Sequence, residues 1–419
     1  MDIEALDDIE IYDLYQKLIS STYPPFLKKY GVNNLAIKAE EALIIDSYGK
    51  EYIDCVSGFG LFNIGHNHQK LILDIITQLK RSQLFTRPLI SRIQVEAATI
   101  LSDITPSELK CSFLCNSGSE AIDSAIKLAR LSTGKSEIIV ADNAFHGYTY
   151  GALSASGIDS FHKFFKPLLP DIVHVEFNNI EELSKNINSK TAAILLEPIQ
   201  HEAGIAQIDY NYLHEARKIC NRSNVILIFD EVKTGMGRTG SMFAFEHFNV
   251  TPDILVLGKA LGGGIIPIGA IIARENVWNK FSLSFPMSAS SFAGNVLACR
   301  ALISTIEIIK QEELVLACRE QGEVLYDRLE SLAAFYPEII SKVSGKGLLL
   351  GLQVRNTLIA FRIAREMIKN GILIFPAFAD NRTLMIEPPL IISDKQVQVI
   401  IKNLEKIIKN IGVTANEKM

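Results

Sequence analysis

The feature that most constrains the fold is a series of short apolar segments that alternates with helical patterns between residues 110 and 275. Apolar strands separated by helices are typical of a parallel sheet that is covered on both faces. We therefore expect a large α/β domain in the middle of the chain. Its predicted strands are Ile138–Val140, Ile172–Phe177, Ala192–Leu196, Val225–Phe229, Ile254–Leu257 and Ile268–Ile272.

The two ends of the chain show a different pattern. Residues 41–55 contain two β-like runs around a turn at Gly49, which indicates a hairpin. Residues 394–411 carry apolar side chains at helical spacing and predict a closing helix. We expect a smaller α+β domain from both ends, with residues 1–60 and 301–419 flanking a large domain at 61–300. Its predicted C-terminal strands are Leu348–Val354, Ile372–Phe375 and Thr383–Ile386.

The composition argues against several classes of protein. There are 42 Lys and Arg against 47 Asp and Glu, whereas a nucleic-acid-binding protein normally carries a basic surface. The start MDIEALDDIE lacks the basic residues and apolar run of a secretory signal, and no apolar run is long enough to span a membrane. The six scattered cysteines include no CxxC pair. We expect a cytoplasmic protein with no nucleic-acid, membrane or metal partner.

A phosphate site is predicted where residues 116–121 open a helix. Ser117 and Glu120 have the spacing of a capping box. Gly118 and Ser119 would place free N–H groups and a hydroxyl at the positive end of the helix dipole. An ordinary helix cap without a ligand has the same residues, so this segment alone leaves both interpretations open.

Two charged residues follow predicted buried strands. Asp230 comes directly after Val225–Phe229, and open α/β sheets place their sites at the carboxyl ends of strands. Lys259 lies between Ile254–Leu257 and a run of three glycines, where confinement would favour its neutral form, a nucleophile toward aldehydes. The alternative for Lys259 is an exposed loop side chain.

Together, these three features meet the requirements of one cofactor. Pyridoxal 5'-phosphate needs a lysine that forms a Schiff base, a carboxylate that keeps the ring nitrogen protonated, and a phosphate site. Lys259, Asp230 and the helix that starts at Gly118 would supply them. We therefore expect pyridoxal 5'-phosphate in this protein.

From Tyr52 to Leu390 the sequence resembles the class III pyridoxal-phosphate aminotransferases of fold type I. Within that family it is most similar to the putrescine (diamine) aminotransferases. The resemblance implies a large domain with a mostly parallel seven-stranded sheet. The motifs that carry it are CNSGSEA (115–121), AFHG (144–147), EPIQHEAG (197–204), IFDEVKTGMGRTG (228–240), GKALGGG (258–264), SSFAGNVLAC (290–299) and MIEPPL (385–390).

The resemblance also implies residue roles. Lys259 would carry the cofactor and move the proton, and Asp230 would pair with the ring nitrogen. Ser291 matches a hydroxyl that reaches the phosphate of the neighbouring subunit, which implies a homodimer with shared active sites. The implied cofactor-binding residues are Gly118, Ser119, Phe145, His146, Asp230, Val232, Lys259 and Ser291.

Two departures from the family pattern concern the polarity of the site. Lys233 stands where the family has a glutamine near the phenolic oxygen of the cofactor. Its cation either acts on that oxygen or points away to a surface carboxylate. His201 stands where the family has a glycine. It either narrows the mouth of the site or packs beneath a loop.

Further departures concern the substrate. Met385 replaces an arginine that binds substrate carboxylates, and Phe59 replaces a tyrosine of the ornithine-type members, so we expect both along a hydrocarbon chain. Glu202 is retained without its arginine. We expect it to be an unpaired carboxylate that takes the distal ammonium of a diamine. Arg87 is the candidate partner for the carboxylate of a 2-oxo acid.

These residues favour an aminotransferase that moves an amino group between a putrescine-like diamine, or another ω-amine, and a 2-oxo acid by a ping-pong mechanism. One alternative is a biosynthetic aminotransferase that uses an amino acid to aminate a long-chain or carrier-bound aldehyde or ketone. Another is a racemase or aminomutase on the same scaffold, which needs no oxo-acid acceptor.

Overall fold

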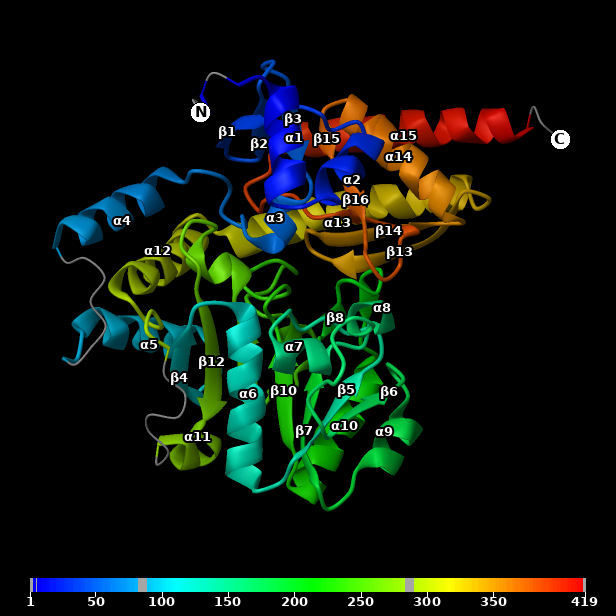
Figure 1. Cartoon of the computed structure of the whole chain (residues 1–419). Helices are drawn as coiled ribbons and strands as arrows, with labels where there is room; N and C mark the ends of the chain where they lie inside the picture. The colour runs from blue at the N-terminus through cyan, green and yellow to red at the C-terminus, as the bar shows by residue number, and fades with distance from the viewer. Residues whose placement is uncertain (1–2, 5, 82–88, 283–289, 417–419) are drawn as a thin grey trace.

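The computed structural model of the chain describes residues 3–4, 6–81, 89–282 and 290–416. A seven-stranded sheet forms the centre of its lower part, and the N-terminal and C-terminal regions of the chain both lie in its upper part (Figure 1). The order of the strands is β4-β12-β11-β10-β7-β5-β6. They are β4 (Leu109–Cys115), β5 (Glu137–Ala141), β6 (Ile172–Val175), β7 (Thr191–Leu196), β10 (Ile226–Asp230), β11 (Ile254–Leu257) and β12 (Gly269–Arg274).

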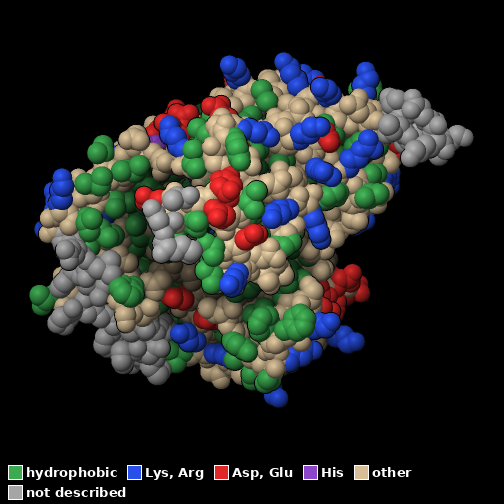
Figure 2. All heavy atoms as spheres, turned by 45° about the horizontal axis from the view of Figure 1, so that its top comes forward, with side chains coloured by type: hydrophobic (Ala, Val, Ile, Leu, Met, Phe, Trp, Pro, Cys, Tyr) green, Lys and Arg blue, Asp and Glu red, His purple; other side chains and the backbone are tan. Residues whose placement is uncertain are grey.

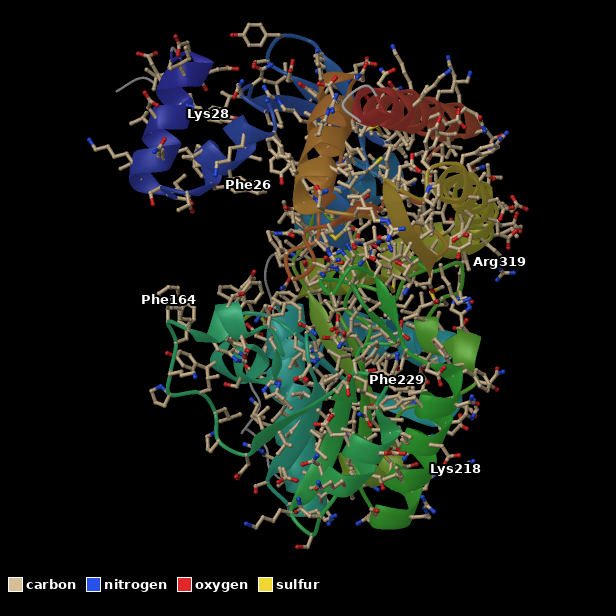
Figure 3. All side chains as sticks on the ribbon, turned by 90° about the vertical axis from the view of Figure 1, so that its right-hand side faces the viewer. Phe26, Lys28, Phe164, Lys218, Phe229 and Arg319 are labelled. Carbon is tan, nitrogen blue, oxygen red and sulfur yellow. The ribbon has the colours of Figure 1, made fainter. Side chains whose placement is uncertain are left out.

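The predicted, mostly parallel α/β sheet is confirmed. Strands β6, β5, β7, β10 and β11 pair in parallel, and β12 runs antiparallel to both of its neighbours. Phe229 of β10 lies in the interior of the lower part, whereas Lys218 lies on its outer surface (Figure 3). The parallel strands of this sheet consist largely of continuous apolar runs because both of their faces are covered.

Helices cover both faces of this sheet. The apolar face of α6 (Gly118–Thr133) packs with Ile228 and Val256 on one side. On the other side, Phe229 and Leu255 pack in the same core as three further helices. These are α5 (Arg92–Ile104), α10 (Tyr210–Ser223) and α12 (Val296–Gln311).

Helix α6 begins and ends where the sequence predicts. The Ser117 side chain accepts a hydrogen bond from the Glu120 N–H, and Gly134 ends the helix with a left-handed φ of 70°. The predicted capping box forms only in part, because the Glu120 carboxylate accepts from the Asn116 N–H instead of returning to Ser117. The carboxylate therefore closes the turn in front of the helix.

The two ends of the chain join in the upper part. The predicted hairpin is confirmed as β2 (Leu43–Asp46) and β3 (Glu51–Asp54), and β3 pairs in parallel with β15 (Ile372–Leu373) from the C-terminal region. The domain boundaries at residues 60 and 300 stay predictions. The other strands of the two four-stranded sheets are β1 (Ala36–Glu40), β13 (Ile340–Lys346), β14 (Leu349–Val354), β16 (Phe375–Pro376) and β17 (Thr383–Ile386). A two-stranded sheet is formed by β8 (Ile199–Gln200) and β9 (Ala206–Gln207).

The remaining elements surround these sheets. Across the described residues, no helix combines the length and the apolar character needed to cross a membrane. On one face, the surface is hollowed where the upper and lower parts meet, with acidic side chains beside the hollow (Figure 2). The remaining helices are α1 (Asp8–Leu18), α2 (Tyr23–Lys29), α3 (Ser57–Gly60), α4 (Gln69–Arg81), α7 (Tyr150–Ala155), α8 (Asp159–His162), α9 (Ile180–Asn186), α11 (Glu275–Ser282), α13 (Leu314–Phe335), α14 (Thr357–Lys369) and α15 (Asp394–Asn416).

Candidate active site

Three ionisable residues lie at the carboxyl ends of three adjacent strands. Glu197 follows β7, Asp230 ends β10, and Lys259 follows β11. Since β10 pairs in parallel with both neighbours, these ends lie on one edge of the sheet. The charges of these three residues influence one another. Burial raises the pKa of Glu197 well above its ordinary value, and the negative charge of Asp230 raises it further. The positive charge of Lys259 acts in the opposite direction. The topology thus builds a polar site where α/β sheets usually have one.

Lys259 sits in a strained backbone conformation. Its φ is 43°, in the left-handed region that non-glycine residues seldom adopt. It begins the short 3-10 helix η2 (Lys259–Gly262) directly after Gly258, and its side chain is half-buried. Backbone strain of this kind persists where the surrounding structure fixes the residue, and it is frequent at active sites.

Asp230 is held by two donors. Its Oδ1 accepts a hydrogen bond from the Val232 N–H at 2.9 Å, and its Oδ2 lies 2.7 Å from Nδ1 of His146. The neighbouring Glu231 is buried too, but it turns away and accepts from the N–H groups of Ala244 and Phe245. Of the two consecutive acids, only Asp230 therefore serves the site.

The N-terminus of α6 forms a cradle beside Asp230. Within the described part of the chain, no protein acceptor binds the N–H groups of Gly118 and Ser119. A Cβ on Gly118 would lie 2.7 Å from Cγ1 of Val232, and one on Gly258 would lie 3.0 Å from the Gly118 Cα. Only glycine lets the three segments approach this closely.

Phe145 and Ser119 help to shape this cradle. The Phe145 N–H donates to Glu197 at 2.9 Å. The Tyr148 N–H donates to Oγ of Ser119 at 3.2 Å, and a Cβ on Gly147 would lie 2.0 Å from that oxygen. The segment after β5 is thereby packed onto the first turn of α6.

Four buried ionisable side chains form a continuous hydrogen-bonded chain beside Lys259, which we call the ionic chain. The Lys233 ammonium bonds Oε2 of Glu387. Oε1 of Glu387 lies 2.5 Å from Nε2 of His201, and Nδ1 of His201 lies 3.0 Å from Oε1 of Glu202. Oε2 of Glu202 accepts from the Phe378 N–H at 3.1 Å. No more than 6% of any of the four residues is exposed.

The charges in the ionic chain shift one another's protonation. Burial alone would raise the pKa of Glu387, but His201 and Lys233 hold it well below its usual range. Burial lowers the pKa of Lys233 to about 8. The negative charge of Glu387 partly opposes this shift, and the positive charge of Lys259 adds to it. Burial alone would also raise the pKa of Glu202. The hydrogen bond and the charge of His201 outweigh burial, so that the pKa of Glu202 lies below its ordinary value. Both carboxylates are therefore ionised at neutral pH.

The expected substrate residue Phe59 lies on a left-handed turn. Ser57, Gly58, Phe59 and Gly60 all have positive φ values, between 49° and 90°. The Phe59 ring stacks on that of Phe378, with 6.1 Å between the centroids. A Cβ on Gly60 would lie 2.8 Å from Cδ of Lys233. The turn therefore presents an aromatic side chain directly above the ionic chain.

The comparisons with known proteins agree with this geometry. The sequence model of the family "Aminotransferase class-III" matches residues 28–408. The chain belongs to this family. Class III aminotransferases use pyridoxal phosphate.

Solved structures of aminotransferases superpose over almost the whole chain. The ornithine aminotransferase from Toxoplasma gondii has a TM-score of 0.91 and 27% identity, covering 100% of this chain and 97% of that one. A transaminase from the marine bacterium Virgibacillus has a TM-score of 0.91 and 25% identity, with 97% and 100% covered. The acetylornithine aminotransferase from Elizabethkingia anophelis has a TM-score of 0.83 and 27% identity, also with 97% and 100% covered.

The residues present fit the cofactor of this family. The unpaired N–H groups of Gly118 and Ser119 suit a phosphate at a helix N-terminus. Asp230, oriented by His146, suits a protonated ring nitrogen, and Lys259 follows the next strand. Nε2 of His146 is buried and has no partner among the described residues. This edge of the sheet is therefore the candidate site for the cofactor.

Several expectations about the substrate residues need correction. Glu202 is not unpaired, because His201 and the Phe378 N–H bind both of its oxygens. Lys233 does not point to a surface carboxylate; it bonds the buried Glu387. The Met385 side chain is only 4% exposed and packs in an apolar cluster with Ile199, Ile205, Leu349 and Ala377. Met385 thus packs in an apolar cluster, and its expected contact with a substrate chain stays a prediction.

Three expectations lie partly or wholly beyond what the structure tests. Arg87 falls outside the described residues. Ser291 is exposed in a turn at 291–294, next to Ser290, whose Oγ accepts from Asn116 at 2.8 Å. Phe145 contacts Tyr148 with 5.2 Å between ring centroids, and its contact with the cofactor stays a prediction.

Sequence reasoning missed Glu197 and Glu387. Glu197 directly follows a buried strand, and that position, like the position of Asp230, could have indicated it. Glu387 also follows a predicted strand, but that strand, β17, belongs to a small antiparallel sheet to which the rule does not apply. Only the fold brings it to Lys233 and His201.

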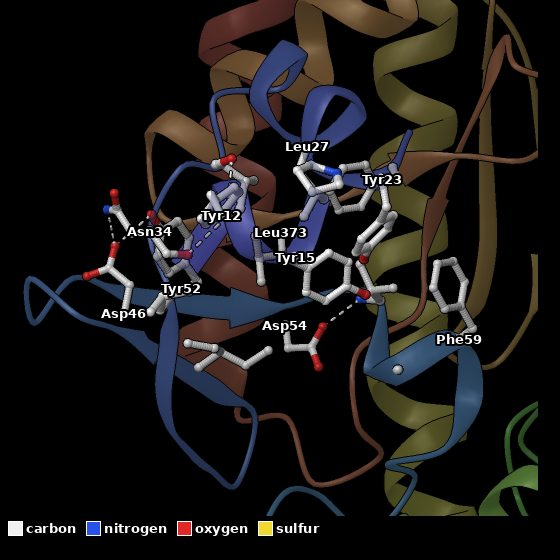
Figure 4. A pocket seen from close by; sticks show the side chains of 18 of the residues that line it. Tyr12, Tyr15, Tyr23, Leu27, Asn34, Asp46, Tyr52, Asp54, Phe59 and Leu373 are labelled. Atoms are coloured by element: carbon white, nitrogen blue, oxygen red, sulfur yellow. Dashed lines mark hydrogen bonds between the residues drawn. The ribbon is translucent and has the colours of Figure 1, made fainter. Parts of the chain in front are cut away.

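A separate cavity of about 510 Å³ lies between α1, α2 and the sheet of β1–β3 (Figure 4). Mostly apolar and tyrosine side chains line it, among them Tyr12, Tyr15 and Leu373. Of the expected substrate residues that the structure describes, Phe59 alone lines it. The cavity therefore adjoins the candidate active site at Phe59, but neither Lys259 nor Asp230 lines it.

Proposed function

We propose that this class III aminotransferase moves an amino group between a putrescine-like diamine, or another ω-amine, and a 2-oxo acid. The amine loses its amino group to the bound cofactor and leaves as an aldehyde. The 2-oxo acid then takes up that group and leaves as an amino acid. The proposed enzyme is a cytoplasmic homodimer with shared sites, in which the exposed Ser291 reaches the partner's phosphate site.

The observation that carries this proposal is the buried carboxylate of Glu202, which lies close enough to Lys259 for the two charges to interact. A carboxylate has about four positions at which it accepts hydrogen bonds. His201 and the Phe378 N–H occupy two of them. The remaining positions suit the ammonium at the far end of a diamine whose first amine reacts beside Lys259, while Phe59 and Phe378 contact the methylene groups between.

Two arginines that could bind a donor carboxylate are occupied. The Arg238 guanidinium is fully buried and donates to the carbonyls of Leu348 and Pro388 and to Oδ1 of Asn63. Arg382 is half-exposed and pairs with Asp380. This favours donors whose remote end is cationic or apolar over donors held by an α-carboxylate.

The side chains at the sheet edge have distinct tasks. Bound pyridoxal phosphate supplies the ring that accepts the electron pair left when the substrate carbon loses its proton. Lys259 would take that proton from the substrate carbon and pass it to the cofactor. Asp230 keeps its negative charge toward the ring nitrogen, and the bond to His146 fixes its direction. Gly118 and Ser119 bind the phosphate through their N–H groups.

A second candidate function rests on the cavity beside Phe59. An amino-acid donor would load the cofactor, and a long-chain aldehyde would accept the amino group. The apolar cavity of about 510 Å³ has room for a hydrocarbon chain that passes Phe59. In this case the preferred donor is glutamate or alanine.

The visible spectrum of the holoenzyme separates the two candidates. Amines are added one at a time without an acceptor, and conversion of the cofactor to its amine form is followed. The proposal predicts rapid conversion by putrescine and cadaverine and slow conversion by ornithine. Conversion by glutamate or alanine alone would contradict it and favour the second candidate.

A further inference from the structure

The ionic chain connects the proposed substrate anchor to residues that do not touch the substrate. Starting at Glu202, it runs through His201 and Glu387 to Lys233, entirely within the protein interior. His201 and Glu202 are neighbours in one turn. The other two contacts join side chains from segments that are far apart in the sequence. A buried chain of charges fixes its members only if every partner is present.

The hydrogen bonds favour the cationic form of His201. Both ring nitrogens face carboxylate oxygens, at 2.5 and 3.0 Å. A neutral imidazole has one N–H and can donate to only one of two ionised carboxylates. A ring that is protonated at both nitrogens can donate to both carboxylates and, with Lys233, balance their charges.

Each end of the ionic chain has its own neighbours at the active site. The positive charge of Lys259 lowers the pKa of Glu202 and also that of Lys233. Glu387 bonds both His201 and Lys233. The His201 ring therefore cannot turn away from Glu202 without breaking its bond to Glu387.

We propose that His201 and Glu387 are positioning residues that fix Glu202 as an ionised anchor and so make the enzyme select substrates with a cationic far end. This inference rests on the proposed amine donor. His201 supplies the N–H that directs Oε1 of Glu202, and Glu387 keeps the His201 ring oriented and charged. Glu202 then presents its free acceptor positions to the ammonium.

The test is a double-mutant cycle on the holoenzyme. The ratio of kcat/KM for putrescine to kcat/KM for butylamine, an amine of equal length without the second ammonium, is measured in the wild type, His201→Gln, Glu202→Gln and the double variant. Each single substitution is expected to lower this ratio about tenfold, the loss typical of a charge-assisted contact. The double variant is expected to lower it no further, because both act through the same carboxylate.

Other outcomes overturn the inference. If His201→Gln lowers kcat/KM equally for both amines, or lowers the ratio further in the Glu202→Gln background, His201 does not act through Glu202. Glu387→Gln gives the same test should His201→Gln fold poorly, with a smaller fall in the ratio expected. His162→Gln, which removes a buried histidine bonded to the Leu153 carbonyl, is the control and is expected to leave the ratio unchanged. A wild type that converts no amine, or a ratio that even Glu202→Gln leaves unchanged, contradicts the proposed function itself. A ratio that falls in Glu202→Gln and stays at the wild-type value in His201→Gln and Glu387→Gln contradicts only this inference.

Discussion

Nε2 of His201 lies 2.5 Å from Oε1 of Glu387, although 186 residues separate them in the chain. The fold therefore places an imidazole ring between two carboxylates where the family resemblance implies a glycine at position 201. This buried polar contact connects the large sheet to the C-terminal region. It also explains why the substrate end of the site carries a fixed negative charge at Glu202.

The Lys233–Glu387 pair is expected to show strong energetic coupling. Removing one partner leaves a buried charge without its counter-ion, which typically costs about 3–5 kcal/mol. We expect Lys233→Met to lower the free energy of unfolding by about that amount. The Lys233→Met, Glu387→Gln double variant should cost less than the sum of the two single variants, as measured by denaturant unfolding. The exposed pair Lys38–Glu40 is the control and should show no measurable coupling. Additive costs for the buried pair would contradict this account.

Gly118→Ala is expected to weaken cofactor binding. Its new Cβ would meet Val232 at 2.7 Å and force the cradle apart. Titration of the apoenzyme should show a dissociation constant raised about tenfold or more for pyridoxal phosphate, since overpacking typically costs 1–3 kcal/mol. Gly134→Ala, at the other end of α6, strains a left-handed residue without meeting another atom. It should cost about 1 kcal/mol of stability and leave the cofactor affinity unchanged. Equal affinities in both variants would count against the cradle.

Glu231 should make stability depend on pH. Burial raises the pKa of Glu231 to about 7, against the hydrogen bonds from Ala244, Phe245 and Thr234. The folded state therefore binds a proton that the unfolded state releases near its ordinary value of 4.5, so this residue's contribution to stability falls as pH rises from about 4.5 to 7. Relative to Glu231→Gln, the wild type should lose about 2–3 kcal/mol across that range in denaturant unfolding. A constant difference between the two proteins would show that the shift is absent.

Lys259 is expected to be the only lysine that carries the cofactor covalently. After borohydride reduction of the holoenzyme, peptide mapping should find the cofactor on Lys259. Lys259→Ala should lose this label and lower the rate of amine conversion by at least about 10²-fold, because the proton-transfer group is gone. Lys233→Gln is the matched comparison. It should keep the label, since the Lys233 ammonium is held by Glu387. Label on Lys233 in the wild type would contradict the assignment.

Much of the fold could be predicted because buried parallel strands have a strong signal. Ala192–Leu196 in β7 and Ile254–Leu257 in β11 are apolar without interruption, and the residues after such strands gather at one edge of the sheet. This rule placed Asp230 and Lys259 correctly beside each other. The strand β4 escaped prediction because Lys110 and Ser112 interrupt its apolar pattern. The predicted strand Ile372–Phe375 is two short strands in different sheets, since Ile374 lies between them.

The polar contacts at the mouth could not be predicted from one sequence. Lys233 and Glu387 are 154 residues apart, and neither position alone indicates a buried partner. Met385 shows the same limit. Its place beside Gly351 and Phe375 in the small sheet turns it toward Ile199 and Leu349, which local pattern does not reveal. Pairing across a sheet and between distant segments determines these environments.

Transfer of labelled nitrogen tests the central claim most directly. The holoenzyme is incubated with ¹⁵N-putrescine and 2-oxoglutarate, and the products are followed by mass spectrometry. The account predicts ¹⁵N-glutamate in equal amounts with the aminoaldehyde, or with the cyclic imine that it forms. No such transfer from any diamine or ω-amine, together with nitrogen transfer from glutamate to a long-chain aldehyde or isomerisation of an amino acid without an acceptor, would contradict it.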